Sequence, residues 1–424
     1  MTALDQWLEL APKPWDLKPE KKWHVFLSYR SVNRPWVIKL YDVLRHLGYE
    51  VFLDQYVLAA SEQLIESLEE GLEKSAAGVL VWSTHADDSK WCRREYQYME
   101  NCAEDDEDFH YVVVKLDKVK LPGFADLRLY SDFSDFPEGP RGSGLLKLLY
   151  GLSGQPLPDA AVRLALEVDG EVKNSLLEIR GALDNGNHEK LQQLATAEGL
   201  AWITTPTLGC EVAESLIKLR RYDEAVAALD IVQERFPSAV RPVQLRGLAQ
   251  ARSGDWRAAQ DTLDNLVAGG EQDPETLGIY ARTWTDRYKE SGDVNHLKRS
   301  RKHYAKAFES DPSDYYTGIN AASKSVLLGE LDAAEEYAKK VEEIVGTQEY
   351  EGDYWKTATA AEIQLIRRNY DAAARLYDAA VVMASEEHGS HESSWNQAQL
   401  LMEKLQPSDE ERQKIAAVFA HLSK

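Results

Sequence analysis

Short apolar runs alternate with amphipathic segments from about residue 20 to residue 155. The runs predict buried strands at residues 23–28, 49–54, 79–82 and 111–116, and a shorter run at 127–130 predicts a fifth strand. Between the runs, apolar residues recur at helical spacing, and Gly48 is suited to end the first of these helices. Strands that alternate with helices in this way are typical of an α/β fold, here a flavodoxin-like five-stranded parallel sheet covered on both faces.

The second half of the chain has a different pattern, because from residue 159 onward it is almost wholly helical. Small residues recur there at intervals of 34, 41, 34 and 39 residues, at Ala225, Ala259, Ser300, Ala334 and Ala373. Twelve residues before four of them lies another small residue: Ala213, Gly247, Ala322 and Ala361. Small residues let paired helices approach closely, and a period of about 34 residues is typical of tetratricopeptide repeats. The pattern therefore predicts an all-α tetratricopeptide solenoid.

These two patterns predict the domain organisation. A stretch rich in glycine and proline at 131–158 indicates a boundary near residue 155. We predict an N-terminal arm at 1–20, an α/β domain at 21–155, a helical adaptor at 156–204, and repeats at 205–424 that end in a capping helix.

The charge and the cysteine content narrow the class of protein. The 424 residues carry a formal net charge of -22, which argues against binding to nucleic acid or to an anionic membrane surface. The sequence has no apolar run of about 20 residues and no signal-peptide pattern near its start, so we expect no membrane span. Its three cysteines match neither a disulfide framework nor a zinc site, which favours reduced thiols in the cytoplasm and no bound metal.

Candidate chemistry gathers where the predicted strands end. Residues 28–31, 54–56 and 88–95 all follow strands, so they should meet at one edge of the sheet. Neither G-x-G-x-x-G nor a P-loop occurs there, which argues against a Rossmann dehydrogenase or a P-loop ATPase. Trp91 and Glu95 lie four residues apart on a predicted helix and therefore share a face. An aromatic plate beside a carboxylate suits a flat cationic ring, although a half-buried tryptophan beside a solvated glutamate has the same pattern.

Three motifs carry a resemblance to a known family. The segments Val25-Phe26-Leu27-Ser28-Tyr29-Arg30-Ser31, Val51-Phe52-Leu53-Asp54 and Ser89-Lys90-Trp91-Cys92-Arg93-Arg94-Glu95 occur in order, at the expected strand positions. Together they resemble the signature motifs of a Toll/interleukin-1 receptor (TIR) domain. Some members of that family are signalling adaptors, and others cleave NAD+.

The resemblance implies a role for each candidate residue. Glu95 occupies the position of the catalytic glutamate of the NAD+-cleaving members, and Trp91 offers a face to the pyridinium ring. Tyr29 and Arg30 are expected to border the nucleotide, with Arg30 suited to the pyrophosphate. Asp54 opens a loop that, in the family, also contributes to head-to-tail contacts between domains.

The repeats show a resemblance of their own. Segments at 273–277, 314–322 and 353–362 resemble the tetratricopeptide-like TRAFs-binding regulatory region of apoptosis signal-regulating kinases. No H-R-D or D-F-G motif accompanies them, so the resemblance implies a regulatory helical module and no kinase activity. Four aromatic residues in these segments either line a groove or pack between repeats: Tyr315, Tyr316, Tyr354 and Trp355.

The sequence is thus identified as similar to bacterial TIR proteins that cleave NAD+. We expect hydrolysis or cyclisation of NAD+ as the substrate, with no resident cofactor, switched on when TIR domains self-associate into a filament or another oligomer. The repeats are expected to bind a protein partner, and the family's roles imply immune or stress defence, including defence against phage. Two alternatives remain open: a non-enzymatic scaffold whose repeats bind a protein, and a domain that binds a nucleotide as a signal without turnover.

Overall fold

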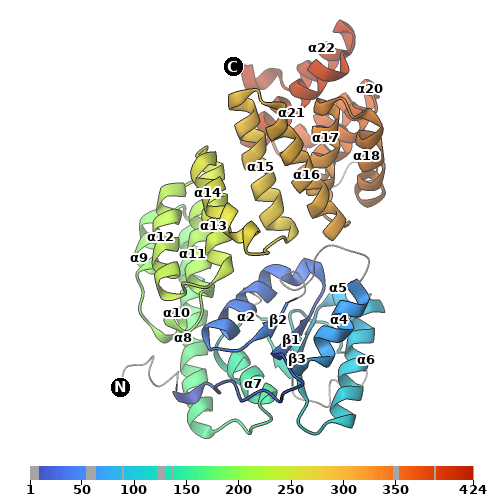
Figure 1. Ribbon diagram of the computed structural model, residues 1–424. Coiled ribbons are helices and arrows are strands. Elements are labelled where there is room, and N and C mark those ends of the chain that lie inside the picture. Colours follow the sequence, from blue (N-terminus) through green and yellow to red (C-terminus); the bar gives the residue numbers. More distant parts are fainter. Residues whose placement is uncertain are drawn as a thin grey trace. The chain divides into compact units, whose positions relative to one another are not determined.

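The computed structural model describes residues 9–53, 64–87, 90–121, 130–135, 138–346, 353–385 and 388–423. The chain forms two compact units, Met1–Glu271 and Gln272–Lys424 (Figure 1). The first unit contains the sheet and the first helices of the solenoid, and the second contains the remaining helices.

The first unit is built on a five-stranded sheet in which all neighbouring strands are parallel. Its strands are β1 (Trp23–Ser28), β2 (Val51–Phe52), β3 (Ser75–Trp82), β4 (His110–Lys115) and β5 (Tyr130–Asp132). They are ordered β2-β1-β3-β4-β5, and the register places Val25 opposite Val51 and Val79 opposite Val112. The predicted fold class is confirmed.

Only β1 has its predicted bounds: β2 is shorter than the predicted 49–54, β4 begins and ends one residue before the predicted 111–116, and β3 and β5 differ more. β3 begins at Ser75, ahead of the bulky apolar run, because Ser75 and Ala77 are buried although neither signals a strand by size. β5 lies at Tyr130–Asp132 instead of 127–130, and residues 127–129 lie outside the described part of the chain. Only its middle residue, Ser131, is buried, so this edge strand carries no apolar run.

Alternating strand residues face two helical layers (Figure 1). One layer contains α2 (Arg34–His46), which follows the short helix η1 (Ser31–Asn33), and α7 (Gly142–Leu152). The other contains α4 (Leu64–Glu73), α5 (Thr84–Asp87) and α6 (Lys90–Asp105). Val79 and Val81 pack with the first layer, whereas Leu80 and Trp82 pack with the second. The period-two alternation of the strands thus builds both cores.

The described part of the N-terminal segment runs against the same domain. The phenol of Tyr49 donates a hydrogen bond of 2.8 Å to the carbonyl of Pro12, and that of Tyr150 donates one of 2.7 Å to the carbonyl of Leu10. Ala11 is buried in the core between these two contacts.

Helices complete the first unit. They are α8 (Asp159–Asp184), α9 (His188–Ala195), α10 (Leu200–Ile203), α11 (Thr207–Lys218), α12 (Tyr222–Arg235), α13 (Val240–Ser253) and α14 (Trp256–Ala268). Ala213 and Ala225 are fully buried where α11 and α12 form a pair. Ala165 of α8 and Val240 of α13 belong to the same apolar cluster as Leu40 of α2. The sheet domain and the first repeats therefore share a continuous core.

The second unit continues the helical pattern. Its helices are α15 (Pro274–Ser291), α16 (Val294–Ser310), α17 (Tyr315–Leu328), α18 (Leu331–Val345), α19 (Tyr354–Ile366), α20 (Tyr370–Met383), α21 (His388–Leu405), α22 (Asp409–Val418) and η3 (Ala420–Ser423). The small residues Ser300, Ala334 and Ala373 are buried, as close helix pairs require. Among the described residues, no helix is long and apolar enough to cross a membrane.

Candidate active site

The strand order places a topological switch point between β1 and β3. β1 is flanked by β2 on one side and β3 on the other, so the connections leave the sheet in opposite directions there. Ligands of open parallel sheets bind at such a point, beyond the carboxyl ends of the strands. β1 ends at Ser28 and β3 ends at Trp82. We therefore expect a binding site beyond these two strand ends.

Glu95 lies at this edge of the sheet, on the inner face of α6. Cys92, Tyr96 and Met99 anchor the same face in the core, because residues three and four positions apart share a side of a helix. Only 8% of Glu95 is exposed, and its Oε2 accepts a hydrogen bond of 2.6 Å from the hydroxyl of Ser28. A carboxylate this deeply buried requires such a partner, since burying an acid without one is costly.

Tyr29 and Arg30, which follow β1, differ in their surroundings. Tyr29 is half-buried, and its hydroxyl accepts a hydrogen bond of 2.5 Å from Nη1 of Arg34 in α2. Arg30 is exposed to solvent. The contact with Arg34 thus fixes the hydroxyl of Tyr29 against α2.

Arg34 also connects the sheet domain to the end of the first unit. Its Nη2 lies 2.7 Å from Oε1 of Glu271, and the two side chains are 5% and 1% exposed. The pair joins residues 237 positions apart. Sequence reasoning missed it, since Arg34 stands at the start of a helical stripe and Glu271 in a loop after α14.

Asp42 forms a second connection between α2 and the repeats. Its carboxylate accepts hydrogen bonds from the backbone N–H groups of Val240 (2.8 Å) and Arg241 (3.2 Å), at the start of α13. Burial raises the pKa of Asp42 to about 7, although these hydrogen bonds and the charge of Arg241 act in the opposite direction. Its neighbour in α2, Lys39, pairs with Glu211 of α11 at 3.0 Å.

A cavity of about 330 Å³ opens at the same end of the sheet. Its polar lining includes Asn33, whose Nδ2 donates a hydrogen bond of 2.8 Å to the hydroxyl of Ser83, and Asp117, whose Oδ2 accepts two hydrogen bonds of 2.9 Å from Thr84. His85 is exposed in α5 and lines this cavity. These polar groups follow β1, β3 and β4, so they lie beyond the carboxyl ends of the strands, where ligands of such sheets bind.

Two predicted site residues cannot be placed in full. Asp54 lies outside the described residues. Trp91 lies in the first turn of α6, one turn before Glu95, and its side chain is outside the described part of the structure. The roles of Tyr29, Arg30, Asp54, Trp91 and Glu95 stay predictions.

Comparison with known families assigns both parts of the chain. A family model described as TIR domain matches residues 25–148, and one described as Tetratricopeptide Repeats-Sensor matches residues 221–328. The chain contains a TIR domain, which is followed by tetratricopeptide sensor repeats. The switch point and Glu95 both lie within the TIR domain.

Individual relatives cover a smaller part of this TIR protein. Over 80 residues it is 31% identical to proteins named "Probable 2' cyclic ADP-D-ribose synthase TcpB" from Brucella melitensis and Brucella abortus. The match spans 19% of this chain and about a third, 32%, of those relatives. A tetratricopeptide protein of Thermus thermophilus, TTC0263, is similar to 46% of the chain and 99% of its own length, at 18% identity and a TM-score of 0.38.

Both family assignments bear on partners. TIR domains typically self-associate, and tetratricopeptide repeats typically bind proteins.

Proposed function

We propose that the TIR domain cleaves the bond between nicotinamide and ribose in NAD+, with Glu95 as the catalytic carboxylate. The observation that carries this proposal is the burial of Glu95 at the switch point, with Ser28 donating to Oε2 at 2.6 Å. The partial match to TcpB, whose printed name describes synthesis of a cyclic ADP-ribose, supports the same class of reaction.

The chemistry needs a carboxylate in a partly dry place. When nicotinamide leaves with the electron pair of its bond to ribose, C1 of the ribose becomes an oxocarbenium-like cation, as in glycoside hydrolysis. Glu95 stabilises this cation and orients the ribose hydroxyls, and its burial strengthens that interaction. Water then attacks C1 and gives ADP-ribose and a proton. If a hydroxyl of the same molecule attacks instead, the product is cyclic.

The remaining residues of the site bind the rest of NAD+. Arg30 is exposed and free to reach the pyrophosphate, for which a guanidinium is well suited. Tyr29, oriented by Arg34, borders the nucleotide. Trp91 stacks on the pyridinium ring, one helical turn from Glu95, and Asp54 is the remaining substrate-binding residue of the proposal.

Activity depends on assembly in this proposal. Self-association of TIR domains completes the site, and a protein bound to the repeats triggers that association. Such a switch suits immune or stress defence, including defence against phage by NAD+ depletion.

One experiment separates this enzyme from a scaffold. The full chain is incubated with NAD+ at low protein concentration and under crowding, nicotinamide is quantified by chromatography, and sedimentation reports the assemblies. We expect nicotinamide to appear together with the large assemblies. Assembled protein that leaves NAD+ intact would overturn the enzyme and favour the scaffold.

A further inference from the structure

Lys324 is a buried cation in the second unit. It lies in α17, 4% exposed, and its Nζ is 3.4 Å from Oδ1 of Asn320 and 6.0 Å from the ring centre of Tyr304. Among the described residues, no carboxylate pairs with it. Burial lowers the pKa of its ammonium group to about 8, because desolvation penalises the charged form.

The carboxylate that acts most strongly on Lys324 has other partners. Glu362 of α19 raises the pKa of the lysine through its charge. However, its Oε1 accepts hydrogen bonds from the hydroxyl of Ser323 and, at 3.0 Å, from Nε2 of Gln397. Within the described part of the chain, the ammonium group of Lys324 therefore has no direct counter-ion, although buried charges are normally paired.

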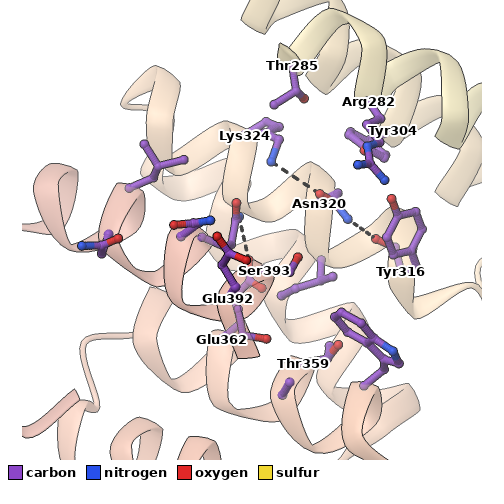
Figure 2. Close-up of a pocket in the computed structure, with 18 of the residues that line it drawn as sticks. Arg282, Thr285, Tyr304, Tyr316, Asn320, Lys324, Thr359, Glu362, Glu392 and Ser393 are labelled. Atoms are coloured by element: carbon purple, nitrogen blue, oxygen red, sulfur yellow. Dashed lines mark hydrogen bonds between the residues drawn. The ribbon is translucent and has the colours of Figure 1, made fainter. Parts of the chain in front are cut away.

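This ammonium group faces a cavity of about 750 Å³ (Figure 2). The cavity is lined by residues of α15, α16, α17, α19 and α21, and its volume lies in the range of small-molecule sites. Tyr316 and Trp355 are each 48% exposed and line the same cavity. A ligand in this cavity can therefore meet both exposed aromatic faces and the ammonium group of Lys324.

The charges of the lining restrict that ligand. Cations come from Arg282, Lys289 and Lys324, and carboxylates come from Asp286, Glu362, Glu392 and Glu403. With one more carboxylate than cations, the cavity disfavours a multiply charged anion such as a pyrophosphate. A single negative charge at Lys324 is the complementary choice.

We propose that this cavity binds a ligand in which one carboxylate, placed at Lys324, is attached to a planar apolar group that packs on Trp355 or Tyr316. The ligand is a free aromatic acid or an acidic residue beside an aromatic one in a bound polypeptide. The site is independent of NAD+ cleavage, since every residue that forms it lies in the second unit.

The melting temperature of a Lys324 variant distinguishes a binding role of this lysine from a structural one. Burying an unpaired charge reduces stability, so Lys324→Met, which keeps the apolar stem, should raise the melting temperature of the ligand-free chain. The matched control is Lys340→Met, since Lys340 is an exposed cation of α18 that pairs with Glu336. A lysine needed for packing or pairing would give the opposite result, a lower melting temperature.

Ligand-observed NMR on the full chain tests binding with defined probes. N-acetylphenylalanine should bind, with a Kd on the order of millimolar for so small a probe. N-acetylphenylalaninamide, which lacks the charge, should bind at least about tenfold more weakly, as should the acid to Lys324→Met. Lys340→Met should bind the acid like the wild type. Trp355→Ala or Tyr316→Ala should also weaken binding of the acid.

One further probe identifies the source of the ligand. A pentapeptide blocked at both ends, with aspartate beside phenylalanine, represents the polypeptide, and tighter binding of it than of the acid assigns a protein ligand. Tighter binding of the acid assigns a small molecule. Four results would each overturn the proposal. Two concern the charge: equal binding of acid and amide, or unchanged binding of the acid to Lys324→Met. The other two are no binding of any carboxylate probe, and a preference for the multiply charged ADP-ribose.

Discussion

The hydroxyl of Ser28 donates a hydrogen bond of 2.6 Å to Oε2 of Glu95, and this contact joins the end of β1 to the inner face of α6. Both side chains are buried. The contact places the carboxylate at the switch point of the sheet, where ligands of open parallel sheets bind.

Ser28→Ala should therefore affect stability and catalysis together. It removes a partner of the buried Glu95, which should cost about 1–3 kcal/mol in the free energy of unfolding. It should also lower kcat for nicotinamide release more than it changes KM, because the ground-state contacts to NAD+ are retained. Urea unfolding and steady-state kinetics give the two quantities. Ser215→Ala is the control: that hydroxyl donates to the carbonyl of Glu211 within α11, so turnover should not change.

The buried pair of Arg34 and Glu271 gives a prediction about stability. Glu271→Gln leaves the guanidinium of Arg34 without its charged partner, and breaking such a pair typically costs about 3–5 kcal/mol. Arg34→Met should cost less in the Glu271→Gln background than in the wild type, because the two residues interact directly. Urea unfolding of the four proteins measures this coupling.

The control for that cycle is an exposed pair. Lys340 and Glu336 lie one turn apart in α18, and Glu336→Gln should change stability by less than about 1 kcal/mol. If the effects of Arg34→Met and Glu271→Gln simply add, the pair does not connect the TIR domain to the end of the first unit.

Asp42 makes stability depend on pH. Burial raises the pKa of its carboxyl from 3.8 to about 7, so between these values the folded chain retains a proton that the unfolded chain releases. The free energy of unfolding therefore falls as the pH rises from about 4 to about 7, because loss of the proton then favours the unfolded chain. In Asp42→Asn this loss is absent. The urea midpoint of the variant, relative to wild type, should rise between about pH 4 and about pH 7 and level off above that. A difference that stays constant with pH would contradict the prediction.

Two glycines in helices of the first unit should respond in opposite ways to alanine. A Cβ at Gly247 in α13 would lie 2.7 Å from Cγ of Leu263, so Gly247→Ala should destabilise by about 1–3 kcal/mol through overpacking. At Gly181 in α8 a Cβ meets nothing within 4 Å, so Gly181→Ala should stabilise by up to about 1 kcal/mol. Thermal unfolding compares the two. A stabilising Gly247→Ala would show that α13 and α14 are not packed as closely as the repeat alignment requires.

The sheet and the repeats could be predicted from sequence because their signals are local. Strand β1 is found at the predicted residues 23–28, since every position from His24 to Ser28 is buried and most are apolar. The small residues of the repeats recur at a regular period, which reports helix pairing without any knowledge of distant contacts. The edge strand β5 has neither signal, because only Ser131 is buried.

The contacts that position the site could not be predicted. Ser28 and Glu95 are 67 residues apart and Arg34 and Glu271 are 237 apart, and no periodic pattern links such pairs. Adjacent aromatic residues also diverge: Tyr354 is buried, with its hydroxyl 2.9 Å from that of Ser394, whereas Trp355 is exposed in a cavity. Successive residues of a helix point in different directions, so the choice between groove and packing needed the structure.

Nicotinamide release by Glu95→Gln under conditions of assembly tests the central claim most directly. The substitution keeps the shape of the side chain and its contact with Ser28 but removes the charge that stabilises the oxocarbenium-like ribose. Glu104→Gln, an exposed carboxylate near the end of the same helix, is the matched control. We expect kcat to fall by at least about a hundredfold in Glu95→Gln and to be unchanged in Glu104→Gln, with both variants assembling like the wild type. Wild-type kcat in an assembled Glu95→Gln would contradict the assignment of Glu95 as the catalytic residue.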